Sequence, residues 1–178
     1  MYKRQEIIGS FDPNDKLVTP KGIGDEHFIE ANTPLEYKIR FQNTGNDTAF
    51  QVVLVDTLDV AHLDISSFEV LNYSHDYSLE IVAGQILRFT FDNILLVDST
   101  TNEPESHGFV SFKINQMPDN EIGTVIENQA YIFFDYNQPI LTPLAFSTIW
   151  EEPPFLQTSI FEAENSLVTI YPRNFFVF

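Results

Sequence analysis

The chain has 178 residues with 26 acidic and 9 basic side chains, and its formal net charge of -17 disfavours nucleic acid and anionic membranes as partners, because both bind clustered lysine and arginine. It contains no cysteine, which excludes disulfides, thiol catalysis and cysteine-ligated metals. Because 43% of the residues are hydrophobic and 17 are phenylalanine, we expect a folded domain whose acidity lies on its surface.

The first clear strand spans residues 35–42, where apolar residues from Leu35 to Phe41 alternate with polar ones. The turn-forming residues 43–47 follow, and residues 50–55 form a second strand. We expect these two strands to pair as an antiparallel hairpin.

More strands are predicted further along the chain, each bounded by turn-forming residues: 68–73, 77–82, 86–91, 109–114 and 125–134. In the last two, apolar residues recur at every second position, as on the inner faces of two packed sheets. No window shows an apolar stripe with helical spacing. Seven or more short strands predict an all-β protein, an antiparallel immunoglobulin-like β-sandwich.

The proline-containing residues 151–154 mark the end of this sandwich. We therefore expect residues 1–150 to form the domain and residues 151–178 to form a linker and tail. No apolar run approaches the length of about 18 residues that crosses a membrane, and residues 1–6 lack the apolar segment of a signal peptide. We expect no membrane insertion, and an exported domain would have to belong to a longer precursor.

Catalytic motifs are missing from the sequence, so we expect no enzyme. The four histidines lie far apart without metal-ligand spacing, and neither a nucleophile elbow nor a glycine-rich phosphate loop occurs. A hydrolase with a pair of acids stays open as an alternative, because such a site needs only two carboxylates facing each other across a cleft.

Two acidic loops are candidates for calcium, which prefers six to eight oxygen ligands in flexible geometry. One contains Asp12, Asn14 and Asp15, and the other contains Asp135 and Asn137 after the last long strand. Asp and Asn are also the preferred residues of turns, which would explain both loops without a metal. We expect no required cofactor, with Ca²⁺ as the one candidate ligand.

Several motifs follow one another in an order that resembles a known family: residues 9–16 (GSFDPNDK), 35–50 (LEYKIRFQNTGNDTAF), 56–58 (DTL), 106–110 (SHGFV) and 128–140 (NQAYIFFDYNQPI). The chain is similar, over about residues 6–145, to the immunoglobulin-like conserved-repeat domain that precedes the C-terminal sorting tail of large secreted Bacteroidetes proteins. This resemblance implies a non-catalytic spacer, structural or adhesion domain of a secreted or cell-surface protein. Its partners would be the other domains of the same precursor.

The tail carries a weaker resemblance. Residues 165–172 (NSLVTIYP) are similar to the opening strand of a type IX secretion sorting domain. That strand usually runs into Tyr-Pro-Asn-Pro, whereas here Pro172 is followed by Arg173 and Asn174, and the chain stops at Phe178. The resemblance therefore implies a truncated sorting tail.

Related surface sandwiches also suggest an isopeptide bond, formed between a lysine on the first strand and an asparagine near the last with the help of a buried acid. Lys16 precedes the apolar Leu17 and Val18, Asn128 has an inward phase on the last long strand, and Asp56 ends the second strand. An uncharged, buried amine could attack the Asn amide. Alternatively, Lys16 is a solvated charge and Asn128 is a hydrogen-bonded strand residue.

A carbohydrate-binding module attached to a secreted enzyme is the alternative function. Tyr131 and Phe133 have the outward phase of the last strand and could form a stacking platform for a polysaccharide or surface partner. The same rings could instead be covered by a neighbouring sheet, domain or tail.

Overall fold

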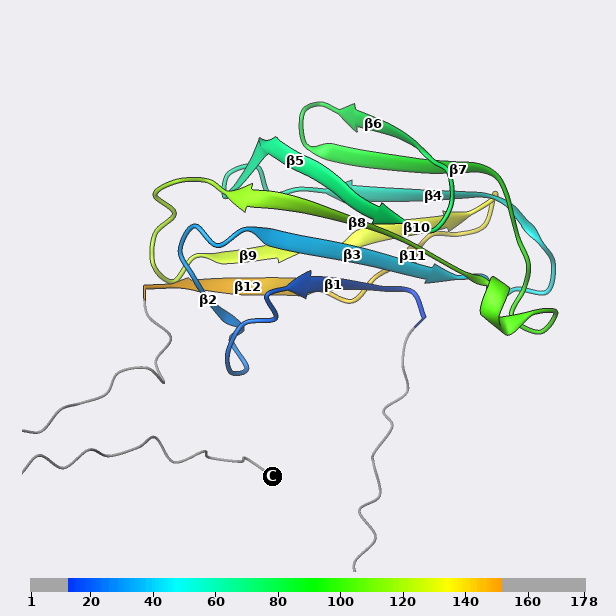
Figure 1. Cartoon of the computed structure of the whole chain (residues 1–178), viewed down its shortest axis with the longest axis horizontal. Helices are drawn as coiled ribbons and strands as arrows, with labels where there is room; N and C mark the ends of the chain where they lie inside the picture. Colours follow the sequence, from blue (N-terminus) through cyan, green and yellow to red (C-terminus); the bar gives the residue numbers. More distant parts are fainter. Residues whose placement is uncertain (1–12, 152–178) are drawn as a thin grey trace, which may run out of the picture.

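The computed structural model describes residues 13–151, and most of this range is strand (Figure 1). The strands are β1 (Asp15–Thr19), β2 (Phe28–Glu30), β3 (Leu35–Gln42), β4 (Ala49–Thr57), β5 (Leu63–Tyr73), β6 (Ser78–Val82), β7 (Ile86–Leu96), β8 (His107–Gln116), β9 (Val125–Asn128), β10 (Ala130–Phe134), β11 (Ile140–Leu141) and β12 (Ala145–Trp150). Helical structure in this range is limited to the 3₁₀ turn η1 (Glu103–Glu105), and nothing helical there is long and apolar enough to cross a membrane.

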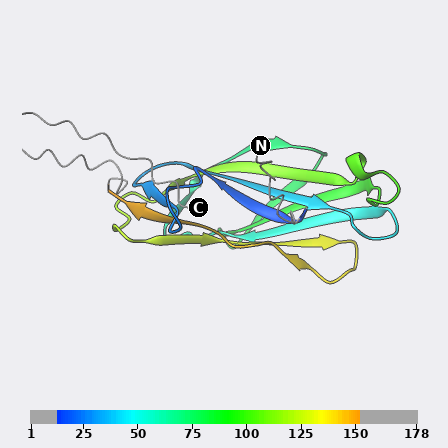
Figure 2. The same cartoon turned by 90° about the horizontal axis from the view of Figure 1, so that it is seen from below.

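The strands form two facing layers (Figures 1 and 2). One layer is the sheet β1-β3-β8-β5, and the other contains the sheet β11-β10-β4-β7-β6. A third sheet, β2-β12-β9, continues the second layer, because β9 runs into β10 with only Gln129 between them. Neighbouring strands are antiparallel except for the β2–β12 pair, which is parallel. This arrangement confirms the predicted all-β, immunoglobulin-like sandwich.

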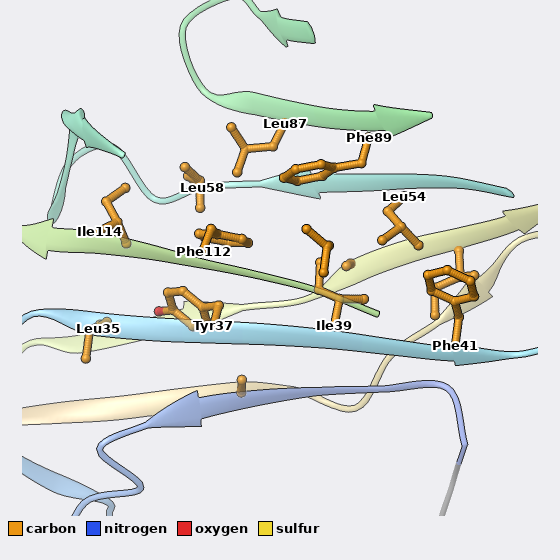
Figure 3. Close-up of a cluster of buried hydrophobic side chains, with 14 of the residues drawn as sticks. Leu35, Tyr37, Ile39, Phe41, Leu54, Leu58, Leu87, Phe89, Phe112 and Ile114 are labelled. Atoms are coloured by element: carbon orange, nitrogen blue, oxygen red, sulfur yellow. The ribbon is translucent and has the colours of Figure 1, made fainter. Parts of the chain in front are cut away.

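The core lies between the layers and is rich in aromatic rings (Figure 3). The alternation in β3 puts its apolar residues on the inner face, where Phe41 packs against Phe91 of the opposite sheet with ring centroids 5.3 Å apart. Phe112 of β8 stacks on Phe89 of β7 at 6.3 Å. Both contacts join the two layers, so the two sheets are held together by the apolar faces that the sequence alternation creates.

The predicted hairpin between residues 35–42 and 50–55 is wrong. Both strands exist, but β3 pairs with β1 and β8, whereas β4 pairs with β7 and β10. The intervening loop crosses from one sheet to the other. The buried Asn43 anchors this crossing, since its amide donates to the carbonyls of Asp47 and Leu96 and its backbone N–H donates to the carbonyl of Ser106. Two strands with one apolar face each can lie face to face as well as side by side, and here they face each other.

The other predicted strands are confirmed as β5 to β10, with the expected strand 125–134 divided at Gln129. The predicted ranges missed β1, β2, β11 and β12, and only the isopeptide hypothesis placed Lys16 on a first strand. β2 and β11 have only three and two residues, too few to show a period. In β12 the buried Ser147 and Thr148 interrupt the apolar pattern.

The described range begins and ends toward opposite ends of the long axis. β1 starts between the middle and one end of the sandwich, and β12 finishes at the opposite end (Figure 1). Residues 1–12 and 152–178 lie outside the described range, and they include Asp12 and the predicted sorting tail. The division into a domain of residues 1–150 and a tail of residues 151–178 therefore stays a prediction.

Candidate functional site

Three polar side chains meet inside the sandwich: Lys16 of β1, Asp56 of β4 and Asn128 of β9. The side chains of Lys16 and Asp56 have no exposed surface, and Asn128 is 2% exposed. Charged residues are almost never fully buried without a partner. A lysine, an aspartate and an asparagine buried together therefore form the most unusual polar group of the described core.

Lys16 points inward from the edge strand β1. It pairs with Ile39 of β3, and its Nζ lies 4.7 Å from the centroid of the Tyr37 ring and 5.6 Å from that of Phe112. These two rings cover the amine from its own layer. Burial lowers the pKa of Lys16 to about 8, although the nearby Asp56 carboxylate opposes this shift.

Asp56 occupies a position in the apolar inner row of β4, two residues after Leu54 and two before Leu58. The Lys16 ammonium donates to its Oδ2, while its Oδ1 has no hydrogen-bond partner. Burial raises the pKa of Asp56, against the effect of Lys16, which lowers it. Desolvation thus moves both members of the pair toward their uncharged forms.

Asn128 reaches the pair from the end of β9, the strand that runs into β10 beside β4. Ala130 pairs with Asp56 across β10 and β4, and Asn128 lies two residues earlier in the chain with the same inward phase. Its amide is close enough to lower the pKa of Asp56 and of Tyr37, although burial dominates and raises both. Neither Nδ2 nor Oδ1 of Asn128 makes a hydrogen bond of acceptable geometry.

Unsatisfied atoms are concentrated in this cluster. Five buried side-chain polar atoms of residues 13–151 lack a hydrogen-bond partner, and three of them are Asp56 Oδ1, Asn128 Nδ2 and Asn128 Oδ1. Buried polar groups in native proteins are nearly always hydrogen-bonded, so such a concentration calls for a chemical reason. An amine, a carboxyl group and a carboxamide supply a nucleophile, a proton relay and an acyl group.

Sequence reasoning named all three members of this cluster but missed the two aromatic rings that cover the Lys16 amine, those of Tyr37 and Phe112. Both belong to the inward phase of predicted strands, so their burial was predictable, but no sequence signal placed them beside Lys16.

The first calcium loop is already occupied by internal contacts. Asp12 lies outside the described residues. Asn14 Oδ1 accepts the backbone N–H of Gln42. The Asp15 carboxylate accepts from Arg40, with Nε at 2.7 Å and Nη2 at 2.5 Å. The pair follows from the register, because Arg40 lies opposite Asp15 in the β1–β3 ladder.

In the second calcium loop, the Asp135 carboxylate also accepts internal hydrogen bonds. Asp135 Oδ1 accepts the backbone N–H groups of Phe50 and Gln51 at 3.0 and 2.8 Å, which ties the end of β10 to β4. Asn137 donates its backbone N–H to the carbonyl of Phe134. Within residues 13–151 no group of three or more His, Asp or Glu side chains could hold a metal ion. Calcium binding stays a prediction.

The fold and the buried cluster together define an immunoglobulin-like sandwich domain with a polar group sealed in its core. The family model described as "Domain of unknown function (DUF7619)" matches residues 12–148. The chain therefore belongs to this family. No curated protein matches the sequence significantly.

Several solved structures share the fold. The chain is similar to the C-terminal domain of the Streptococcus pyogenes antigen I/II-family protein AspA, with 12% identity and a TM-score of 0.53 over 78% of this chain and 47% of that chain. It is also similar to the N-terminal domain of the Streptococcus gordonii adhesin Sgo0707, with 13% identity and a TM-score of 0.51 over 79% and 33% of the two chains. BcpA, the major pilin subunit of Bacillus cereus, shows 14% identity and a TM-score of 0.50 over 76% and 39%. The chain thus spans less than half of each of these structures.

Proposed function

We propose that this chain is a non-catalytic accessory domain, a spacer, structural or adhesion module, of a larger secreted or cell-surface bacterial protein. The observation that carries the proposal is the path of the chain, which enters the sandwich toward one end and leaves it at the other (Figure 1). That path suits a module threaded between other domains. The fold shared with domains of an adhesin and a pilin subunit supports it by analogy.

The partners that fit this function are the other domains of the same precursor. With a net charge of -17 the surface repels nucleic acid and keeps the module soluble beside its neighbours. The similarity of residues 165–172 to a type IX sorting tail, and the Bacteroidetes origin that goes with it, belong to this proposal. Sequencing upstream of Met1 tests it: a continuous reading frame with a signal peptide is expected.

The spacer geometry can be measured by energy transfer between two fluorescent proteins, one fused ahead of the sandwich and one fused after it. Low transfer is expected, because the two attachment points lie toward opposite ends. A matched control carries the second fluorophore at the exposed Asn46, in the loop between β3 and β4, which lies on the same side of the middle of the sandwich as the start of β1 (Figure 1), and should give high transfer. Equal transfer in both fusions would contradict the proposal.

Carbohydrate binding is the second candidate, favoured by one observation. On the outer face of β10, Tyr131 is 47% exposed and its ring centroid lies 6.5 Å from that of Phe133. Exposed rings in a row can stack on sugars.

Affinity electrophoresis against a panel of soluble polysaccharides separates the two functions. A carbohydrate module would be retarded, Tyr131→Ala would abolish the retardation, and the control Tyr73→Ala, which removes a comparably exposed ring from β5, would not. An accessory domain migrates unchanged in every gel.

A further inference from the structure

We propose that Lys16 and Asn128 become joined by an intramolecular isopeptide bond that the folded chain forms by itself, with Asp56 as the proton relay. The bond would link Nζ of Lys16 to Cγ of Asn128 and so tie β1 of one layer to β9 of the other. The chemistry rests on the buried cluster alone and does not depend on the proposed function.

The positions of the three side chains support the reaction. The Lys16 amine is held at the Asp56 carboxyl by a direct hydrogen bond, and the Asn128 amide lies beside that same carboxyl. Asn128 of β9 lies two residues before Ala130, which pairs with Asp56 across β10 and β4, and both side chains share the inner face, while Lys16 reaches them from the opposite layer. Groups held in this way react as if at a very high local concentration.

The electrostatics favour the reactive forms. An amine attacks only when it carries no proton, and burial lowers the pKa of Lys16 while it raises that of Asp56. Transfer of one proton from the ammonium to the carboxylate within the pair gives a neutral amine beside a neutral acid. The cluster exchanges no proton with solvent to reach that state.

The reaction balances without any oxidant or co-reactant. The Nζ lone pair attacks Cγ of Asn128, and protonated Asp56 donates to the developing oxyanion at Oδ1. The carboxylate then takes a proton from the attached nitrogen and delivers it to the departing amide nitrogen, and as the carbonyl re-forms, the hydroxyl at Oδ1 returns its proton to Asp56. A C–N bond forms, the Cγ–Nδ2 bond breaks, ammonia leaves, and Asp56 ends in its starting protonated form.

The product resolves the missing hydrogen bonds. Of the three unsatisfied atoms, Asn128 Nδ2 departs as ammonia. The remaining two satisfy each other, because protonated Asp56 Oδ1 can donate to the amide oxygen Oδ1 of Asn128. Asp56 Oδ2 can still accept the single N–H left on Lys16 Nζ. If the bond does not form, the three atoms stay without hydrogen-bond partners. A buried ion pair by itself adds little stability.

Intact-mass spectrometry of the folded, purified chain tests the proposal. The expected mass is lower than the sequence mass by one ammonia, about 17 Da. Proteolysis should then yield one branched peptide that contains both Lys16 and Asn128. An unshifted mass would overturn the proposal, and so would a loss of ammonia that maps to other residues.

Variants identify the reacting groups. Lys16→Met keeps the length of the side chain but removes the nucleophile, and it should have its full calculated mass. The control Lys21→Met alters an exposed lysine nearby and should keep the loss of ammonia. Asp56→Ala should also retain the full mass, and a loss of ammonia in that variant would refute the relay. Circular dichroism checks that each variant folds, and if Lys16→Met does not, the peptide map of the unaltered chain decides.

Discussion

Replacing Gly108 by alanine should destabilise the sandwich, although the usual expectation for such a change in a strand is the opposite. Gly108 lies in β8 opposite Phe41 of β3, and a Cβ added there would lie 2.2 Å from both Cε2 and Cζ of the Phe41 ring. That ring is fully buried against Phe91 and Phe134, so it cannot move aside freely. Overpacking of this kind costs about 1–3 kcal/mol.

The sign of the effect makes the prediction decisive. At a backbone conformation that alanine tolerates, Gly→Ala alone stabilises a protein by about 0.4–1 kcal/mol, because it restricts the unfolded chain. The φ of Gly108 is not positive, so alanine can adopt its backbone conformation. Only the Phe41 ring then opposes the substitution. A loss of stability in Gly108→Ala therefore measures the contact with Phe41.

The assay is urea unfolding of the unaltered chain, Gly108→Ala, Phe41→Leu and the double variant. Because leucine removes the ring, Gly108→Ala should cost at least about 1 kcal/mol less in that background. The control is Gly84→Ala, where φ is +70° and nothing lies within 4 Å of the added Cβ, so its cost should be the same in both backgrounds. A stabilised Gly108→Ala, or an equal cost with and without the Phe41 ring, would refute the reasoning.

Three further predictions concern the acidic groups. Asp135→Ala should lower the free energy of unfolding by about 1 kcal/mol, because the N–H groups of Phe50 and Gln51 lose their acceptor, whereas Asp135→Asn should retain most of the stability; equal urea midpoints for both variants would contradict this. Hydrogen bonds from Thr100 and Thr101 lower the pKa of Asp98 from 3.8 to about 2, so its contribution to stability is complete above about pH 4 and is lost as the pH falls toward 2. The difference in unfolding free energy between the unaltered chain and Asp98→Asn should therefore shrink in acid, and a constant difference from pH 7 to 2 would count against it. Added Ca²⁺ should raise the melting temperature if the loops at Asp12–Asp15 and Asp135–Asn137 bind it, and an unchanged melt across a millimolar titration removes that expectation.

The sequence by itself determined the class of fold and the faces of most strands. Alternation along residues 35–42 and 125–134 predicted which side chains point inward, because successive side chains of a strand point to opposite faces whatever strand lies next to it. The inward phase of Asn128 and the position of Asp56 at the end of an apolar strand followed from the same rule. Together with the isopeptide bonds of related surface sandwiches, these positions nominated both residues as members of a buried site.

Only the tertiary structure decided which strands pair and which polar groups are buried. Alternation specifies a face but not a neighbour, so β3 and β4 were expected side by side and instead face each other. Asp15 and Lys16 are adjacent in sequence, yet Asp15 pairs with the partly exposed Arg40, whereas Lys16 has no exposed side-chain surface and pairs with Asp56 in the core. No local sequence signal predicts that the two residues have such different partners. The difference arises because β1 presents Lys16 to the interior, where residues 40 and 112 positions further along the chain supply the carboxyl group and the carboxamide that surround it.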